Sequence, residues 1–352
     1  MKYLFLLSGD YIGLAKEEVL SLFDIKNYKI VDKLLIIDLK NNEKISTKSN
    51  KRLALTKRIY RFLFECKVNE LIKIMENFDW NSIYKDSFRL RLHYLNQNKL
   101  NKSSEKDFAK YIWRALKKPR VNLENPKTKI ELFFVDDKAY CGLLIKENKE
   151  DFESRKAHLR PFPHPSSLHP KLARALVNIT GIKDNETLLD PFCGTGGFLI
   201  EAGLMNIKIA GCDISKNMVK GSKENLKHFK IKNYEIIDKD ALKINKKLGY
   251  IVTDLPYGLN SNVYLQYNKN SLKQKSNKIN LKINQKNQIK NLEQFYLKFL
   301  KNLRKIMKKR AVLIFPNYVN YKKLIKIATL KIEKDFSIYV HRSLTRKIVK
   351  IR

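Results

Sequence analysis

One stretch of the sequence, residues 187–202, constrains the fold of this chain more than any other. A short apolar run ends at Asp190, a turn follows, and Gly194-Thr195-Gly196-Gly197 leads into the apolar start of a helix. Glycines let the backbone come close to a ligand. A second apolar run ends at Asp213, about 20 residues after the glycines, where nucleotide-binding α/β folds place the carboxylate that holds ribose hydroxyls. The stretch therefore predicts an α/β domain that binds a nucleotide-like ligand.

A second motif lies at residues 251–258, which read Ile-Val-Thr-Asp-Leu-Pro-Tyr-Gly. Open α/β sheets bind ligands at the carboxyl ends of their strands. Asp254 and the carbonyl group of Leu255 can each accept a hydrogen bond from an exocyclic amino group, while the ring of Tyr257 stacks on a planar base. Taken alone, the segment is equally consistent with a proline turn that closes a buried strand. The glycine loop favours the base-binding interpretation.

Together the two motifs narrow the class of protein. A dehydrogenase would share the glycines and Asp213, but the Asp-x-Pro-Tyr pattern has no task in hydride transfer. A P-loop nucleotide hydrolase is excluded because no Lys-Ser or Lys-Thr follows the glycines. With Asp240 in Asp-Lys-Asp-Ala-Leu, the motifs resemble those of class I S-adenosylmethionine-dependent methyltransferases that methylate amino groups.

Three further segments resemble one family within that class, the archaeal tRNA guanine-10 2-amino dimethyltransferases. Residues 160–181 are similar to the segment before that family's catalytic domain, residues 341–346 to its final hairpin, and residues 4–20 to its start. The resemblance implies an α/β fold. It consists of a Rossmann-like class I methyltransferase domain, with a mostly parallel sheet and an antiparallel terminal hairpin, preceded by an α+β ferredoxin-like and THUMP RNA-binding region.

The predicted organisation has four parts: an N-terminal ferredoxin-like domain (1–60), a THUMP-like RNA-binding domain (61–148), a linker (149–165) and the methyltransferase domain (166–352). Residues 52–64 are expected to form a helix. The Lys- and Asn-rich residues 260–291 are expected to form a low-complexity loop beside the active site, which either folds over RNA or is a tolerated insertion.

The resemblance also implies roles for individual residues, with S-adenosylmethionine as cofactor and tRNA as partner. The residues expected at the methyl transfer are Asp254, Leu255, Pro256 and Tyr257. Those expected at the cofactor are Asp190, Phe192, Gly194, Gly196, Asp213, Ile214, Asp240 and Ala241. Candidate phosphate contacts in the first half are Arg89, Arg91, Arg114, Lys117, Lys118 and Arg120, although any one of them is equally consistent with ordinary solvated surface.

The chain departs from the family pattern at one position. Two prolines usually follow the aspartate, and here Leu255 replaces the first. The carbonyl group that accepts from the amine survives this change, whereas the restriction that proline places on φ is lost.

Composition supports a nucleic-acid partner. The 352 residues carry a formal net charge of +37, which favours a polyanion, although part of the lysine excess accompanies abundant isoleucine and asparagine as in AT-rich genomes. Four scattered cysteines argue against a zinc site and fit a reducing compartment. Three histidines at 158, 164 and 169 have no cysteine or carboxylate partners at ligand spacing, so no metal is expected. The apolar runs are too short to span a bilayer, which predicts a cytoplasmic protein without a membrane partner, and we expect a monomer.

The predicted activity is therefore methylation of the 2-amino group of a guanosine in tRNA, with position 10 favoured by the resemblance. One alternative is a guanosine at another position of tRNA or ribosomal RNA. The other is an RNA-binding protein whose methyltransferase half is inactive.

Overall fold

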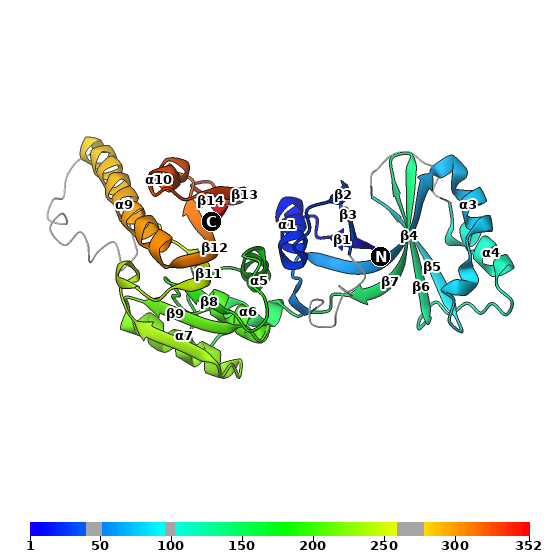
Figure 1. The fold of residues 1–352 in the computed structure, drawn as a ribbon, viewed down its shortest axis with the longest axis horizontal. Coiled ribbons are helices and arrows are strands. Elements are labelled where there is room, and N and C mark those ends of the chain that lie inside the picture. The colour runs from blue at the N-terminus through cyan, green and yellow to red at the C-terminus, as the bar shows by residue number, and fades with distance from the viewer. Residues whose placement is uncertain (40–50, 96–102, 166, 259–277) are drawn as a thin grey trace. The chain divides into compact units, whose positions relative to one another are not determined.

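The computed structural model describes residues 1–39, 51–95, 103–165, 167–258 and 278–352, and it leaves out the side chains of 278–286. The chain forms two compact units, each described by itself (Figure 1). Unit 1 comprises Met1–Lys16, Ile25–Lys51 and Leu55–Lys149, and unit 2 comprises Glu17–Asp24, Arg52–Ala54 and Glu150–Arg352.

Unit 1 is built on one seven-stranded sheet in the order β2-β3-β1-β4-β7-β6-β5. Its strands are β1 (Lys2–Leu7), β2 (Tyr28–Val31), β3 (Leu34–Asp38), β4 (Thr56–Lys67), β5 (Phe88–Tyr94), β6 (Thr128–Val135) and β7 (Lys138–Glu147). Its helices are the first part of α1 (Ile12–Phe23), α3 (Leu71–Asn77) and α4 (Glu105–Ala115), with single 3-10 turns at Val68–Glu70 and Trp80–Ser82. Strands β5 and β6 are parallel, and the other neighbours are antiparallel.

The helix predicted for residues 52–64 is wrong. From Thr56 on, the segment belongs to β4, which pairs with β1 on one side and with β7 on the other. Thr56, Ile59, Tyr60 and the phenylalanines that follow are the β-branched and aromatic types that fit a pleated surface between two strands. The predicted boundary between residues 60 and 61 falls inside β4, so one continuous sheet extends across it.

A buried carboxylate lies within the sheet of unit 1. Glu131 on β6 is 1% exposed and accepts hydrogen bonds from the Tyr60 hydroxyl (2.7 Å) and, through Nε2, from His93 (2.7 Å). The guanidinium of Arg58 approaches it to 3.4 Å. Burial raises the pKa of Glu131, but these partners outweigh it and hold the pKa below its ordinary value.

Unit 2 contains a second seven-stranded sheet, ordered β10-β9-β8-β11-β12-β14-β13. Its strands are β8 (Thr187–Asp190), β9 (Lys208–Asp213), β10 (Tyr234–Asp238), β11 (Leu248–Asp254), β12 (Met307–Pro316), β13 (Ile332–His341) and β14 (Leu344–Ile351). Its helices are α5 (Pro170–Ile179), α6 (Gly197–Leu204), α7 (Lys216–His228), α9 (Lys278–Ile306) and α10 (Tyr321–Ile327), with 3-10 turns at Glu153–Arg155, Ala157–Leu159 and Ala241–Lys243.

The first five strands of that order are parallel, and β14 and β13 form an antiparallel hairpin at the edge. This arrangement confirms the predicted fold class, a mostly parallel sheet with an antiparallel terminal hairpin. The strand order reverses between β8 and β11, which is the place where open α/β sheets bind ligands.

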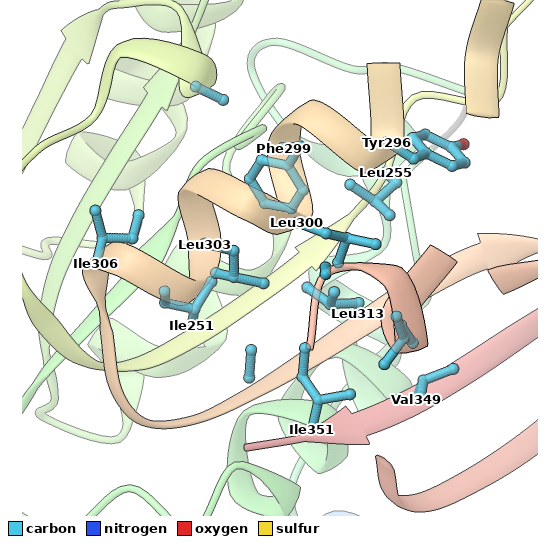
Figure 2. Close-up of a cluster of buried hydrophobic side chains, with 14 of the residues drawn as sticks. Ile251, Leu255, Tyr296, Phe299, Leu300, Leu303, Ile306, Leu313, Val349 and Ile351 are labelled. Atoms are coloured by element: carbon cyan, nitrogen blue, oxygen red, sulfur yellow. The ribbon is translucent and has the colours of Figure 1, made fainter. Parts of the chain in front are cut away.

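Helix α9 packs on the strands of unit 2 that come late in the sequence, β11, β12 and β14. Its apolar positions recur at helical spacing, and Tyr296, Phe299, Leu300 and Leu303 are fully buried against β11 and β12 (Figure 2). The helix begins at Lys278, so residues 278–291 are helical, and the expectation of a loop there is wrong. No glycine or proline interrupts residues 278–306, so their intrinsic helix propensity agrees with the helix that forms. Residues 260–277 of the predicted loop lie outside the described residues.

Two short N-terminal segments belong to unit 2 through buried polar contacts. Glu18 Oε1 accepts hydrogen bonds from the backbone N–H of Ala54 and from the side chain of Asn178, both at 2.8 Å. Lys350 on β14 donates to Glu17 at 2.8 Å, and both side chains are buried. A fragment that starts at residue 150 would leave Asn178 and Lys350 without these partners, so the activity of this fold is best tested in the full chain.

Candidate active site

A pocket of about 670 Å³ opens at the carboxyl ends of β8, β9 and β11 in unit 2. Eight of the predicted site residues line it: Asp190, Phe192, Gly194, Asp213, Asp254, Leu255, Pro256 and Tyr257. The two motifs, separated by about sixty residues of sequence, therefore meet at one cavity.

On one side of this pocket, Asp213 is hydrogen-bonded to the glycine loop. Gly194 and Gly196 have positive φ angles of 50° and 83°, which side chains disfavour. Asp213 Oδ2 accepts a hydrogen bond from the N–H of Gly194 (3.0 Å), and its Oδ1 accepts from the N–H of Ser215 (2.9 Å). Burial raises the pKa of Asp213, while these N–H groups act in the opposite direction. The carboxylate thus orders the loop and keeps lone pairs for a ligand hydroxyl.

Asp190 links the two strands β8 and β11 beside the pocket. It is 1% exposed at the end of β8, and its Oδ1 accepts from the Thr253 hydroxyl on β11 (2.7 Å) and from the N–H of Phe192 (3.2 Å). Burial raises the pKa of Asp190 to about 7 despite the hydrogen bond from Thr253.

Asp254 ends β11 and faces the pocket with Tyr257. The Tyr257 hydroxyl donates to Asp254 Oδ1 at 2.5 Å and accepts from Nε of Arg346 at 3.1 Å. Removal from water raises the pKa of Asp254 to about 6, although the positive charge of Arg346 and the Tyr257 hydrogen bond act to lower it. Burial also raises the pKa of Tyr257 well above its ordinary value. At neutral pH Asp254 is therefore mainly a carboxylate, and Tyr257 keeps its proton.

Residues 255 and 256, which follow Asp254, are held by hydrogen bonds to β12 and α9. The N–H of Leu255 donates to the carbonyl of Ile314 on β12 (3.2 Å), and its side chain lies in the core beside Tyr296 and Leu300 (Figure 2). The Tyr296 hydroxyl donates to the carbonyl of Pro256 at 2.7 Å. A proline at position 255 would lack that N–H. The leucine thus supplies a hydrogen bond and buried apolar surface where the usual proline restricts φ.

Four predicted cofactor residues are not among the described residues that line the pocket: Gly196, Ile214, Asp240 and Ala241. Asp240 instead begins the 3-10 turn Ala241–Lys243, where its Oδ1 accepts from the N–H of Leu242 (2.9 Å). Ala241 packs in the core below α9. Contact of these four with the cofactor stays a prediction.

Several residues that line the pocket were not among the site residues predicted from the sequence. His164, Pro165, Ser167 and Leu168 come from the segment around the end of the predicted linker. The Ser167 hydroxyl lies 3.1 Å from the Thr195 hydroxyl, which ties this segment to the glycine loop. Its proline- and histidine-rich sequence was the available signal. The remaining additions are Cys193, Thr195, Gly197, Phe198, Ser215, Met218, Gly258 and Tyr318.

The candidate phosphate contacts lie in unit 1, mostly around the end of α4. Arg114, Lys117, Lys118 and Arg120 are exposed. Arg120 pairs with Asp86 at 3.2 Å. The other two have protein partners: Arg91 pairs with Glu105 at 2.7 Å, and Arg89 donates to the carbonyl of Leu123 at 3.0 Å. Their contact with RNA stays a prediction.

The described part of the chain offers neither a metal site nor a membrane-spanning helix. Among the residues with described positions, no group of three or more His, Cys, Asp or Glu side chains is arranged to hold a metal ion. In the same part of the chain, no helix combines the length and apolar character needed to cross a membrane.

Comparisons with known proteins agree with this site. The family model described as RMKL-like, methyltransferase domain, matches residues 157–263. A tRNA (guanine(10)-N2)-dimethyltransferase of Methanothermobacter thermautotrophicus is 33% identical over 303 residues, covering 85% of this chain and 82% of that protein. One of Pyrococcus abyssi is 29% identical over 344 residues, covering 95% and 94%. The crystal structure of TrmN from Thermus thermophilus, 16% identical, covers 100% of this chain and 99% of its own with a TM-score of 0.51, so the fold is shared. The predicted resemblance is confirmed, and the chain belongs to the family of tRNA (guanine(10)-N2)-dimethyltransferases.

Proposed function

We propose that this protein transfers methyl groups from S-adenosylmethionine to the exocyclic 2-amino group of the guanosine at position 10 of tRNA. The observation that carries the proposal is the position of Asp254 and Tyr257. They lie at the end of β11, in the same pocket as the glycine loop and Asp213. One cavity therefore holds both a nucleoside-type binding loop and acceptors for an amino group.

The residues of the pocket fit a cationic cofactor. Three carboxylates line it, from Asp190, Asp213 and Asp254, and its described lining includes no lysine or arginine. In a chain of net charge +37 this local excess of negative charge is unusual, and it suits a sulfonium ion. When bound, S-adenosylmethionine supplies an electrophilic methyl group on that sulfonium. Asp213, Phe192 and the loop at Gly194 would hold its nucleoside half.

The chemistry required of the protein concerns the nitrogen of guanine. Its lone pair is delocalised into the ring, so the amine is a weak nucleophile. Asp254 and the carbonyl of Leu255 can accept hydrogen bonds from its two N–H groups. They would favour tetrahedral geometry at the nitrogen as the N–CH3 bond forms and the bond from that methyl to sulfur breaks. The nitrogen then loses one proton, and Asp254, with a pKa of about 6, is placed to take it.

An aspartate at this place supports guanine rather than adenine as the base. Guanine carries a ring N–H beside its amino group, so an acceptor-only carboxylate can pair with both. Adenine has a hydrogen-bond acceptor in its ring at the equivalent position. That acceptor would meet the acceptor-only carboxylate of Asp254, and no hydrogen bond could form between them. The base has to leave its helix to enter the pocket, and Tyr257 can support it by stacking.

We propose that the basic residues of unit 1, Arg114, Lys117, Lys118 and Arg120 among them, position the tRNA through its phosphates. A pocket that reads one base cannot select a single guanosine in a whole tRNA, so contacts elsewhere have to set the position. We further propose that the protein acts as a monomer in the cytoplasm, a reducing compartment that its four scattered cysteines fit.

The test is methylation of an unmodified tRNA transcript by the full chain, followed by mass mapping of its nucleosides. We expect 2-methyl- and 2,2-dimethylguanosine at position 10. Asp254→Ala should lower turnover well beyond about tenfold, or 1.4 kcal/mol of barrier, while cofactor binding measured by calorimetry persists. Asp238→Ala is the matched control, since it removes a carboxylate from the end of β10, the edge strand of the same sheet, outside the pocket lining.

Three outcomes would contradict the proposal. Methylation at another nucleotide would favour the alternative substrate. Cofactor binding without any methylation would favour an RNA-binding protein. An active Asp254→Ala variant would remove Asp254 from the mechanism.

A further inference from the structure

Arg346 connects the terminal hairpin of unit 2 to the methyl-transfer residues. It lies on β14 opposite Pro316 of β12, so the sheet fixes its backbone. Its Nε donates to the Tyr257 hydroxyl at 3.1 Å, and that hydroxyl donates to Asp254 Oδ1 at 2.5 Å. The three side chains form a chain of two hydrogen bonds that starts at a cation and ends at a carboxylate.

The direction of these hydrogen bonds is set by their chemistry. A guanidinium can donate but cannot accept, so the Tyr257 hydroxyl has to direct its single proton toward Asp254. Arg346 therefore fixes the orientation of the hydroxyl and, through it, the rotation of the Asp254 carboxylate. One oxygen of Asp254 is engaged by Tyr257, and the remaining lone pairs stay available to a substrate amine.

Arg346 also acts on the charge of the site. Four described groups bear on Asp254: Tyr257 in the same segment, Arg346 from β14, Asp190 from β8 and Tyr296 from α9. Arg346 is the cation of this set, and its charge favours the ionised form of Asp254 against burial. Arg346 does not line the pocket, and its hydrogen-bonded connection to the pocket runs through Tyr257 and Asp254.

We propose that Arg346 is a positioning residue for methyl transfer, which holds the Tyr257 hydroxyl and the ionised Asp254 carboxylate in the arrangement that receives the guanine amino group. This inference rests on the proposed function. It assigns to the last strand of the sheet a task in the reaction besides closing the sheet edge.

The neighbouring Lys347 provides a matched control. Its Nζ donates to the Ser337 hydroxyl on β13 at 2.8 Å, so it serves the hairpin itself. Lys347→Met removes the same unit of positive charge from the same strand as Arg346→Met. Any loss that comes only from weaker attraction to tRNA should appear in both variants.

The decisive experiment is a double-mutant cycle with Arg346→Met and Tyr257→Phe in the full chain, at saturating tRNA. We expect each single change to lower kcat by about 10- to 100-fold, the range for losing a charge-assisted hydrogen bond, while the Kd of S-adenosylmethionine stays within about twofold. The double variant should be no slower than the slower single variant, because both changes break the same chain. Lys347→Met should keep the wild-type kcat.

The pH dependence gives a second readout that a purely structural arginine would not change. Activity should rise with pH as Asp254 loses its proton. Its pKa is about 6 without cofactor and is lowered by the positive charge of the bound cofactor, so the acid limb of kcat in the wild type should lie at or below pH 6. Without the charge of Arg346 the pKa of Asp254 rises, so the acid limb of kcat in Arg346→Met should move to higher pH.

The outcomes separate this inference from the proposed function. A wild-type protein that does not methylate guanosine in tRNA overturns both. Losses that multiply in the double variant, with an unshifted acid limb, overturn the role of Arg346 and leave the function standing. Should Arg346→Met fail to bind cofactor, Arg346→Lys takes its place. A wild-type kcat in that variant also overturns the role, because an ammonium group does not reproduce the fixed geometry of the guanidinium Nε–H.

Discussion

Replacing Leu255 with proline, the residue that the family usually carries there, should destabilise unit 2 without impairing its chemistry. The change removes the N–H that donates to the carbonyl of Ile314, a residue that is fully buried, and an unpaired buried carbonyl costs about 1–3 kcal/mol. It also removes one or two methyl-sized groups from the core around Tyr296 and Leu300, at about 0.8 kcal/mol each. The lower entropy of the unfolded chain offsets about 0.4–1 kcal/mol. The net loss of stability should be about 1–4 kcal/mol.

The assay has to report on unit 2 alone. Both tryptophans of the chain, Trp80 and Trp113, lie in unit 1, so their fluorescence follows that unit. Hydrogen exchange of the amides in β11 and β12 during urea unfolding follows the affected strands directly. Leu255→Met, which keeps the N–H and the volume, should cost less than about 1.5 kcal/mol. Leu255→Ala, which keeps the N–H but leaves a cavity, should cost about 2–5 kcal/mol.

Turnover per folded molecule should stay within about tenfold of wild type in Leu255→Pro, since the variant retains the carbonyl that we propose accepts from the amine. Two results would refute the reasoning. A proline variant at least as stable as the wild type would show that the hydrogen bond to Ile314 contributes nothing. A stable but inactive variant would show that the reaction needs the side chain or the N–H of Leu255 in addition to its carbonyl.

Three further predictions concern carboxylate side chains. Asp213→Ala should weaken S-adenosylmethionine binding by about 1.5–3 kcal/mol, and unchanged affinity by titration calorimetry would remove Asp213 from the cofactor site. Cofactor binding near pH 6.5 should release protons, because a cation lowers the raised pKa values of Asp190 and Asp254; calorimetry in buffers of different ionisation enthalpy measures this, and proton uptake would contradict it. Glu131→Gln should destabilise unit 1 by about 1.5–3 kcal/mol above pH 4.5. Since the pKa of Glu131 is lowered, its contribution should vanish as the pH falls through that lower value, and a pH-independent difference in tryptophan-monitored unfolding would count against it.

The sequence by itself determined the fold class of unit 2 and the acidic groups of its pocket. Asp190, Asp213 and Asp254 each end an apolar run, and the carboxyl ends of parallel strands meet at one edge of a sheet. The apolar spacing of α9 and the final antiparallel pair were equally legible, because periodicity and local propensity are properties of neighbouring residues.

Only the tertiary structure decided the features that depend on distant partners. Residues 56–64 form a strand because β1 and β7 flank them, and no local pattern contains those neighbours. Leu255 is a core residue because α9 packs over it, and Arg346 reaches Tyr257 across 89 positions of sequence. Such contacts form when the sheet brings strand ends together, so their energies belong to the folded pairings and not to any segment of the chain alone.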